Sequence, residues 1–149
     1  MSEAAAHPMD GQVIAEAVAE ALGARDRASR HVGIEIEAVG DGTAAASMVV
    51  HENLLNGLEV VHGGYIFTLA DTAMAYASNS CNQPALAQTC QVTFLAPGRA
   101  GDRLTATARE AGKAGRTGIY DVEVRNQDGL MIALFRGQTR TISGRIVEG

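Results

Sequence analysis

Asp71 is the only charged residue between Tyr65 and Ser80, in a stretch that is otherwise apolar, small or uncharged. An ionised carboxylate in an apolar setting is costly unless another group pairs with it. Partial burial also makes a carboxylate more basic, which suits a group that takes a proton during a reaction. Asp71 is therefore either a candidate for acid–base chemistry or a buried aspartate satisfied by backbone groups or threonine hydroxyls.

Two glycines, Gly63 and Gly64, precede this stretch and mark the start of the helix that it predicts. The first amides of a helix lack intrahelical acceptors, and glycine lets a ligand approach them closely. A carbonyl oxygen bound there would be polarised, and an oxyanion would be stabilised. Asp71 follows Gly64 by about two turns, so both lie near one stripe, beside Phe67 and Met74. Alternatively, the glycines only permit a tight turn.

The hydrophobic pattern around this helix predicts a single α+β domain built on one sheet. Apolar residues first recur at the spacing of a helix. Before and after the long helix they alternate with polar residues at a period of two, which is typical of strands. The last three strands are typical of an antiparallel meander. The predicted order is a helix in residues 10–29, strands in 31–39 and 43–51, the long helix ending near 80, and strands in 84–98, 102–112, 117–126 and 130–143.

Residues 1–30 are interpreted as an N-terminal helical extension, and residues 31–149 as the main domain. From Tyr65 to Ala77 apolar residues occupy every face of the long helix, and a helix that is apolar all round is buried all round. A flat sheet covers only one side. The sheet must therefore curl around the helix, or a second subunit must cover the rest.

Composition excludes several classes of protein. The 149 residues carry a net charge of −5, whereas binding to a nucleic-acid backbone requires a basic face. No apolar run reaches the roughly 20 residues of a membrane span, and the first residues lack a signal-peptide pattern. Cys81 and Cys90 have no metal-like spacing and are expected to be buried thiols in a reducing compartment. We expect a cytoplasmic protein with no bound metal and no membrane partner.

Four short motifs occur in a specific order: Asn56–Gly57, His62–Gly64, Leu69–Asp71 and Phe94–Gly98. Together they resemble the hotdog-fold thioesterases, and most closely the PaaI branch, the acyl-CoA thioesterases of phenylacetic acid degradation. The resemblance covers about residues 32–142. It implies an antiparallel sheet wrapped around a long central helix. It also implies dimers whose sheets join edge to edge, and usually tetramers of two such dimers.

The resemblance also implies roles for individual residues. Asp71 would attack the thioester carbon as nucleophile, or activate a water as general base. The Gly63 amide would polarise the thioester carbonyl. Asn56 would position the attacking group or the thioester, and His62 would orient the loop and its glycine. Thr89 would reach into the partner's site and hold the attacking water. Alone, Asn56–Gly57 could be a simple turn, and His62 or Asp71 could be structural.

Coenzyme A would enter as part of the substrate, with no separate cofactor. Its phosphates require a few basic groups near the mouth of the site. The candidates are Lys113 and Arg116 in the loop "AGKAGRTG", then Arg99 after Pro97–Gly98, and Arg136 in the last strand. Each could also be an ordinary solvated charge. Gly64, Phe67 and Met74 are the candidate contacts with the rest of the substrate.

Three functions compete. The first is a thioesterase for phenylacetyl-CoA, ring-hydroxylated phenylacetyl-CoA or another acyl-CoA. The second is a hotdog module that binds acyl-CoA without turnover, but such a module could dispense with Asp71 beside Gly63. The third is a hydratase or dehydratase, which needs a differently placed His and acid and a proline in the loop before the helix. The stretch "VVHGGYIF" has no proline, so this function ranks last.

Overall fold

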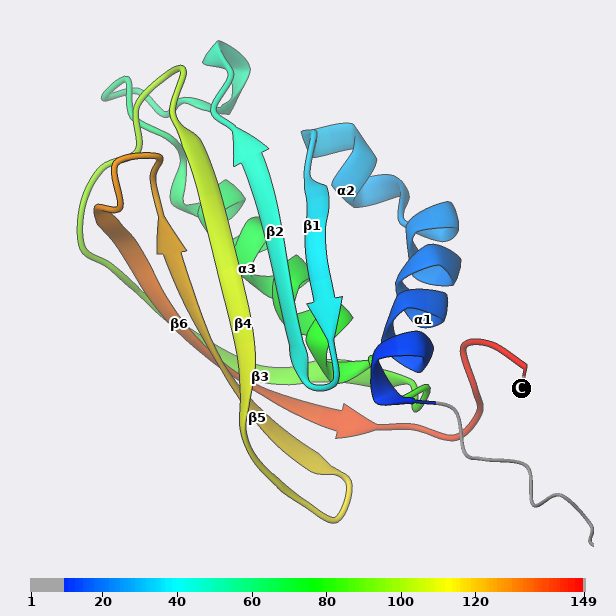
Figure 1. The fold of residues 1–149 in the computed structure, drawn as a ribbon. Coiled ribbons are helices and arrows are strands. Elements are labelled where there is room, and N and C mark those ends of the chain that lie inside the picture. The colour runs from blue at the N-terminus through cyan, green and yellow to red at the C-terminus, as the bar shows by residue number, and fades with distance from the viewer. Residues whose placement is uncertain (1–9, 149) are drawn as a thin grey trace, which may run out of the picture.

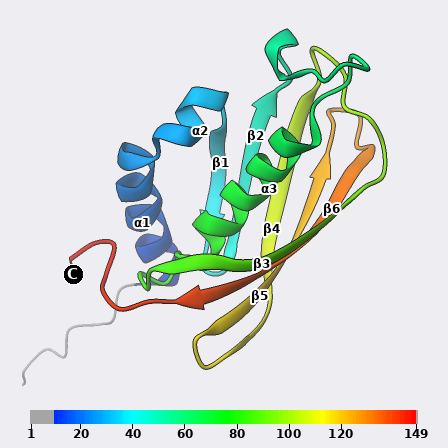
Figure 2. The same ribbon diagram turned by 180° about the vertical axis from the view of Figure 1, so that it is seen from behind.

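The computed structural model describes residues 10–148, in which a six-stranded antiparallel sheet curls around one long helix (Figures 1 and 2). The strand order is β1-β2-β4-β5-β6-β3. The last three strands in the sequence, β4, β5 and β6, are neighbours in the sheet and form the predicted meander. The predicted α+β class and order of the main elements are confirmed. The elements are α1 (Gly11–Arg25), α2 (Arg27–Val32), β1 (Glu35–Gly40), β2 (Thr43–Val49), the 3-10 helix η1 (Glu52–Leu54), α3 (Gly63–Ser78), β3 (Ala85–Phe94), β4 (Arg103–Ala114), β5 (Thr117–Arg125) and β6 (Met131–Thr141).

The core lies between α3 and the concave face of the sheet. Leu104, Ala106 and Ala108 of β4 alternate with outward residues and are fully buried, as the period-two pattern predicts. Leu69 and Ala73 of α3 are equally inaccessible. Small side chains on both sides let the helix approach the sheet closely, so its buried faces are held in one position by packing.

One face of α3 is not covered by the sheet. The partly exposed or exposed residues recur every three or four positions, which places them on one side of the helix. We call this set the open stripe; it consists of Gly64, Phe67, Thr68, Asp71 and Ala75. The sheet therefore buries most of α3 but not the open stripe, so the prediction of a helix buried on every side is only partly confirmed within one chain.

The N-terminal segment differs from the prediction at its end. Asp26 caps a second helix, α2, by accepting a hydrogen bond from the Ser29 amide (3.2 Å), and α2 ends at Gly33 with a φ of 88°. The first strand therefore begins at Glu35 and not at His31. The predicted boundary between residues 30 and 31 falls inside α2, and the part of the extension in residues 1–9 lies outside the described residues.

Two β-bulges change which residues of the edge strands face the helix. In β1 the register shifts between Ile36 and Ala38, so Val39 packs toward the core in place of the predicted Ala38. In β3 the register shifts between Ala87 and Thr89. A bulge adds one residue to one strand and so reverses the inward and outward sides beyond it. Unbroken alternation predicts Leu86 and Cys90 on one side of this strand. The bulge places them on opposite sides, and Leu86 is 62% exposed.

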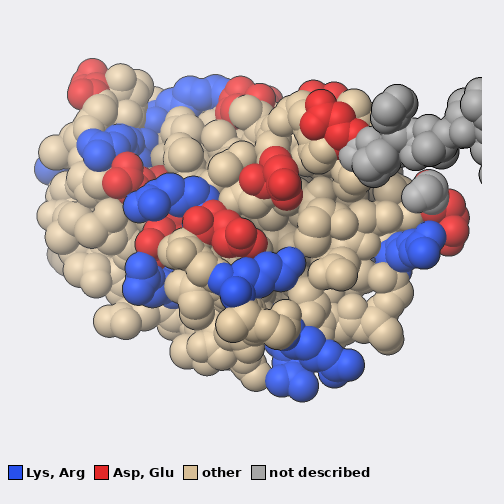
Figure 3. Space-filling model, turned by 60° about the horizontal axis from the view of Figure 1, so that its bottom comes forward, with Lys and Arg blue, Asp and Glu red and all other residues tan. Residues whose placement is uncertain are grey.

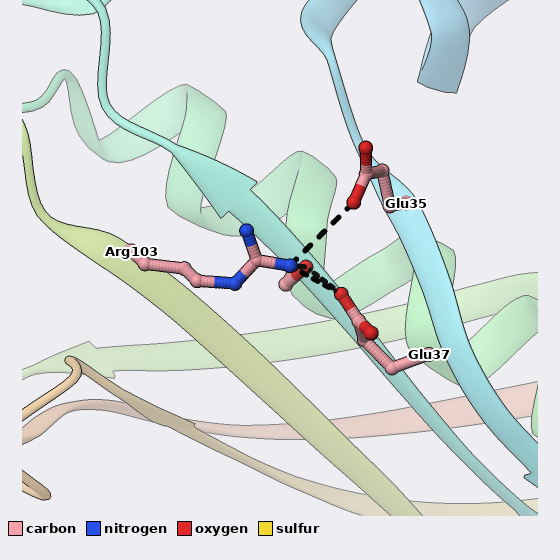
Figure 4. Close-up of polar contacts among 4 residues, drawn as sticks. Glu35, Glu37 and Arg103 are labelled. Carbon is pink, nitrogen blue, oxygen red and sulfur yellow. Dashed lines mark hydrogen bonds and ion pairs between the residues drawn. The ribbon is translucent and has the colours of Figure 1, made fainter.

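The convex face of the sheet carries paired charges. Arg103 on β4 contacts Glu37 (2.5 Å) and Glu35 (3.5 Å) of β1, and donates to the Ser47 hydroxyl at 2.8 Å (Figure 4). These contacts tie the edge strand β1 across β2 to β4. Basic and acidic side chains are interspersed on the face in Figure 3. Among residues 10–148, no helix is long and apolar enough to cross a membrane.

Candidate active site

The start of α3 presents the Gly63 amide without an acceptor among residues 10–148. His62 is the N-cap residue, and its Nδ1 accepts a hydrogen bond from the Gly64 amide at 2.9 Å. The Tyr65 amide donates to the His62 carbonyl at 3.0 Å. Within the described part of the chain, the Gly63 amide has no such partner. Of the two glycines predicted to bind a carbonyl, Gly63 is therefore the one whose amide can donate to a ligand.

A pocket of about 460 Å³ lies beside this amide, between the loop before α3 and residues 94–98. The Phe94 ring covers Gly63 so closely that a Cβ atom on Gly63 would lie 2.9 Å from the ring. Glycine at this position therefore keeps both the ring and the amide at the pocket. The sequence analysis named Phe94 only as part of a motif and not as a site residue. Its position as the last residue of a strand, next to the Pro97–Gly98 turn, was the signal that could have identified it.

Asn56 lines the same pocket and can offer it a hydrogen-bond donor. Its Oδ1 accepts from the amides of Leu58 (2.9 Å) and Val60 (3.3 Å). These bonds close a tight loop in which Glu59 has a φ of 61°. The Nδ2 group has no partner among residues 10–148, and an amide with its oxygen engaged in this way acts toward a ligand as a donor.

Asp71 lies on the open stripe, and no group in the described residues donates a hydrogen bond to its carboxylate. Burial raises its pKa above the ordinary value of 3.8. The alternative of an aspartate satisfied by threonine hydroxyls does not hold within this chain, because Thr68 and Thr72 donate to the carbonyls of Gly64 (2.9 Å) and Thr68 (2.7 Å). The carboxylate is therefore available and more basic than one in water.

Asp71 lies on the side of α3 next to the edge strand β3. Phe67, one turn earlier, packs edge-to-face against Phe135 with ring centroids 5.4 Å apart. Burial, and then the charge of Asp71, raise the pKa of Cys90, so this half-buried thiol of β3 lies near the carboxylate. We call the open stripe of α3 together with Cys90 of β3 the α3–β3 surface. Cys90 was not predicted as a site residue, although the alternation of its strand placed it inward.

The two cysteines also correct an expectation. Both are free thiols, but only Cys90 is partly buried, whereas Cys81 is exposed. Cys81 lies just after α3, and its Sγ is 3.9 Å from Nζ of Lys113. Among the described residues no group of three or more His, Cys, Asp or Glu side chains could hold a metal ion.

Two other predicted residues lie away from the α3–β3 surface of their own chain. Met74 is 1% exposed and packs in the core against Gly137. Thr89 pairs with Gln138 beyond the bulge, and paired residues share a face of the sheet. Because Cys90 faces α3, Thr89 points to the convex face. Its predicted role in a partner's site stays a prediction.

The predicted basic residues are spread over the molecule. Arg99 follows the loop that lines the pocket at Gly63, and its amide donates to Asp102 at 2.8 Å. Lys113 and Arg116 belong to the β4–β5 hairpin at the other end of α3. Arg136 binds the Asp121 carboxylate through two hydrogen bonds of 2.6 and 2.8 Å. In one chain, Arg99 is thus the predicted cation nearest the start of α3.

Gly63 and Asp71 are too far apart to act on one carbonyl within one chain. They are separated by eight residues, or about 12 Å along the helix axis. A donor must lie about 2.7–3.1 Å from the oxyanion, and an attacking atom roughly 3–3.5 Å from the carbonyl carbon. The side chain of Asp71 is too short to close this gap. Both groups can serve the same reaction only if they come from different chains.

Comparison with known proteins identifies the family. Residues 58–133 match the thioesterase superfamily. The chain is 44% identical to the acyl-coenzyme A thioesterase PaaI of Escherichia coli K12 over 128 residues, which cover 86% of this chain and 91% of that protein. The structure of E. coli PaaI, a protein of the phenylacetic acid degradation operon, superimposes with a TM-score of 0.88 at 42% identity, covering 90% of this chain and 97% of that one.

A second solved structure, from Streptococcus mutans, is bound to acetyl-CoA. It is 27% identical, with a TM-score of 0.72, and the match covers 75% of this chain and 90% of that one. The predicted resemblance to PaaI-type proteins and the predicted hotdog fold are thus both confirmed. The chain belongs to the thioesterase superfamily, as a PaaI-type member of the hotdog-fold enzymes that hydrolyse thioesters.

Proposed function

We propose that this protein hydrolyses aryl-acetyl-CoA thioesters, such as phenylacetyl-CoA or its ring-hydroxylated forms, to the free acid and coenzyme A. The observation that carries the proposal is the Asp71 carboxylate, which is half-buried, without a hydrogen-bond partner in the described chain, and placed on the open stripe of α3. The likeness to E. coli PaaI supports the acyl-CoA substrate, and the acetyl-CoA bound to the S. mutans protein supports the coenzyme A part.

The site is completed by a second copy of the chain. In a two-fold dimer each residue of one helix meets its counterpart on the other in reciprocal fashion. If two α3 helices pack antiparallel through their open stripes and cross near Phe67 and Thr68, Asp71 of each lies opposite the start of its partner helix. This arrangement brings Asp71 within reach of the partner's Gly63, which the 12 Å rise along one helix forbids.

The edge strand β3 supports the same dimer. Its ten residues pair with β6 on one side only, so the other side presents free backbone donors and acceptors. An open edge of this length invites pairing with another strand. Because β3 lies beside α3, pairing of two β3 strands and packing of two α3 helices would occur across one continuous surface, the α3–β3 surface. A tetramer of two such dimers remains part of the proposal, as does a cytoplasmic location.

In this site the substrate carbonyl accepts a hydrogen bond from the partner's Gly63 amide, and the positive end of its helix stabilises the oxyanion. His62 accepts a hydrogen bond from the Gly64 amide, so of the two glycine amides only that of Gly63 is available to the substrate. Asn56 of the same chain as this Gly63 adds a second donor, its Nδ2 group. The predicted role of Thr89, to hold the water in the partner's site, is part of the proposal. Gly64 and Phe67 remain the predicted contacts of the substrate, whereas Met74, which is buried in the core, is not one of them.

Two routes are open to Asp71. As a nucleophile, its carboxylate oxygen bonds to the acyl carbon, the C–S bond breaks, coenzyme A leaves as thiolate and takes a proton, and water then cleaves the mixed anhydride. As a general base, it takes a proton from a water whose oxygen attacks the acyl carbon directly. Intact-protein mass after rapid quenching separates the routes, because only the first adds the mass of the acyl group to the protein during turnover.

The phosphates of coenzyme A are assigned to Arg99 near the pocket, with Lys113 and Arg116 of a partner chain. The two-fold arrangement supports this assignment, because it brings the end of one α3 toward the beginning of the other. Cations near the mouth of the site suit phosphates through charge-assisted hydrogen bonds.

The substrate class is tested by a panel of thioesters. Coenzyme A release is followed with a thiol reagent for phenylacetyl-, hydroxyphenylacetyl- and straight-chain acyl-CoA. The proposal expects the highest kcat/KM for the aryl-acetyl thioesters. If all acyl types react with similar kcat/KM, the aryl-acetyl assignment is wrong. If none reacts while coenzyme A thioesters still bind, the protein is a binding module.

A further inference from the structure

A second pocket, of about 480 Å³, lies at the far end of the open stripe from Gly63. Its volume falls within the range of small-molecule sites. The walls combine the N-terminal segment, the C-terminal half of α3, the beginning of β3 and residues 145–146, and they include the cations Arg25 and Arg145. We call it the α1–α3 pocket. The residues that matter here are Leu22, Asp26, Ala75, Tyr76 and Leu86.

This pocket begins close to the catalytic carboxylate. Ala75 belongs both to the pocket and to the open stripe, four residues after Asp71. Four residues correspond to about 6 Å along the axis, which roughly five carbon–carbon bonds of an extended chain span. An acyl group whose carbonyl carbon lies at Asp71 therefore extends its far end into the α1–α3 pocket.

The pocket contains a polar pair, Tyr76 and Asp26, beside apolar side chains such as Leu22 and Leu86. The Tyr76 hydroxyl donates to Oδ2 of Asp26 at 3.1 Å, and the Ser29 hydroxyl donates to the same oxygen at 2.6 Å. Burial, and then the charge of Asp26, raise the pKa of Tyr76, so its hydroxyl remains a donor. Asp26 is thus fixed in position and partly exposed, and it can accept one further hydrogen bond from a ligand.

We propose that the α1–α3 pocket binds the acyl group, and that Leu22 and Asp26 of the N-terminal segment determine which acyl groups are accepted. Leu22 limits the width of a compact apolar group. Asp26 accepts a hydrogen bond from a hydroxyl at the far end of that group. This inference rests on the proposed thioesterase function, and it gives the segment before the sheet a role in specificity.

Leu22→Phe tests the apolar wall, with Val13→Phe as its control. Val13 lies on the same helix, is 50% exposed and is not part of the pocket. Leu22→Phe should lower kcat/KM for phenylacetyl-CoA by about tenfold or more and change acetyl-CoA by less than about twofold. Val13→Phe should change neither. Leu22→Ala, which enlarges the pocket, should instead favour bulkier acyl groups over acetyl.

Asp26→Asn tests the polar end. The single oxygen of asparagine can still accept from the Ser29 amide and cap α2. Its NH2 group then replaces the oxygen that accepts from Tyr76 and Ser29, so the acceptor for a substrate hydroxyl is lost. The ratio of kcat/KM for 4-hydroxyphenylacetyl-CoA to that for phenylacetyl-CoA should fall about fivefold. Equal changes for all thioesters in both variants, or no change, would overturn this inference and leave the proposed function standing. Absence of hydrolysis by the unaltered protein would overturn both.

Discussion

Carboxylates on the two faces of the sheet have pKa values shifted in opposite directions. On the convex face, hydrogen bonds from Ser47 and Arg103 hold the pKa of Glu37 below its ordinary value, and the Arg136 guanidinium does the same for Asp121. At the α3–β3 surface, burial raises the pKa of Asp71, and no described group donates a hydrogen bond to it. Paired carboxylates fasten strands together, whereas the unpaired one keeps its basicity for a reaction.

Donors follow the same division. Arg103 and Arg136 of the convex face are engaged by carboxylates, but the Gly63 amide and the Asn56 Nδ2 group, both at the pocket beside α3, are not engaged within the described chain. A site must leave such groups unpaired so that a substrate can use them, at some cost in stability. The contrast therefore predicts that equal substitutions on the two faces have unequal effects.

The largest effect is expected when one carboxylate on each face is made neutral. Asp71→Asn should lower kcat/KM by about 10²–10⁴-fold, because the attacking or proton-accepting group is lost. Asp121→Asn removes an ion pair of the convex face and should leave hydrolysis within about twofold. Coenzyme A release measures both. An active Asp71→Asn variant would refute the catalytic assignment.

Asn56→Asp sharpens the comparison for donors. The aspartate can still accept from the Leu58 and Val60 amides, so the loop keeps its shape, but the Nδ2 donor is gone. Loss of one donor to a developing oxyanion predicts a decrease of about 10²-fold in kcat/KM. Asn56→Ser, which removes the loop bonds as well, shows how much depends on the loop. Full activity of Asn56→Asp would mean that Asn56 only shapes the turn.

The pH profile should report the raised pKa of Asp71. Only the ionised carboxylate can attack or take a proton, so kcat/KM should rise with pH through the pKa of Asp71. Since burial raises that pKa, the midpoint of the acidic limb is expected above 3.8. Asp121→Asn should leave the midpoint unchanged. A midpoint at or below 3.8 would contradict the proposed setting of Asp71.

The smallest effect concerns stability, and its sign differs between the faces. A folded-state pKa above the unfolded value means that the ionised Asp71 destabilises the fold above that pKa, and the penalty vanishes below the unfolded pKa. Asp71→Asn should therefore raise the melting temperature at neutral pH, and less so in acid. Asp121 has a lowered pKa, so its charge stabilises above the unfolded value and that stability is lost in acid. Asp121→Asn should lower the melting temperature slightly at neutral pH.

The sequence was sufficient for the features that follow from local pattern. Alternation predicted the buried faces of β4 and β5, and the apolar stretch with Gly63 and Asp71 predicted α3. The bulges in β1 and β3 were not predicted, because a single inserted residue leaves the hydrophobic pattern almost unchanged. That omission reversed the expected sides of Leu86 and Ala38.

Contacts between segments that lie far apart in the sequence could not be predicted either. The engagement of Gly64 by His62, which leaves Gly63 free, depends on the geometry of the cap. The positions of Lys113 and Arg116 relative to α3 depend on how far the β4–β5 hairpin extends. The partnership of Tyr76 with Asp26 joins residues fifty positions apart. None of these follows from spacing along the chain.

The central claim is that Asp71 of one chain acts with Gly63 of its partner, and complementation tests it most directly. Gly63→Pro removes the amide donor at a helix position where proline is tolerated, and Gly63→Ala keeps the amide as a control for the contact with Phe94. Asp71→Asn and Gly63→Pro should each be inactive alone. Co-expressed, they should recover about a quarter of the unaltered activity, because half of the dimers are mixed and one of their two sites is intact. No recovery in verified mixed dimers would show that both groups act within one chain and would contradict the account.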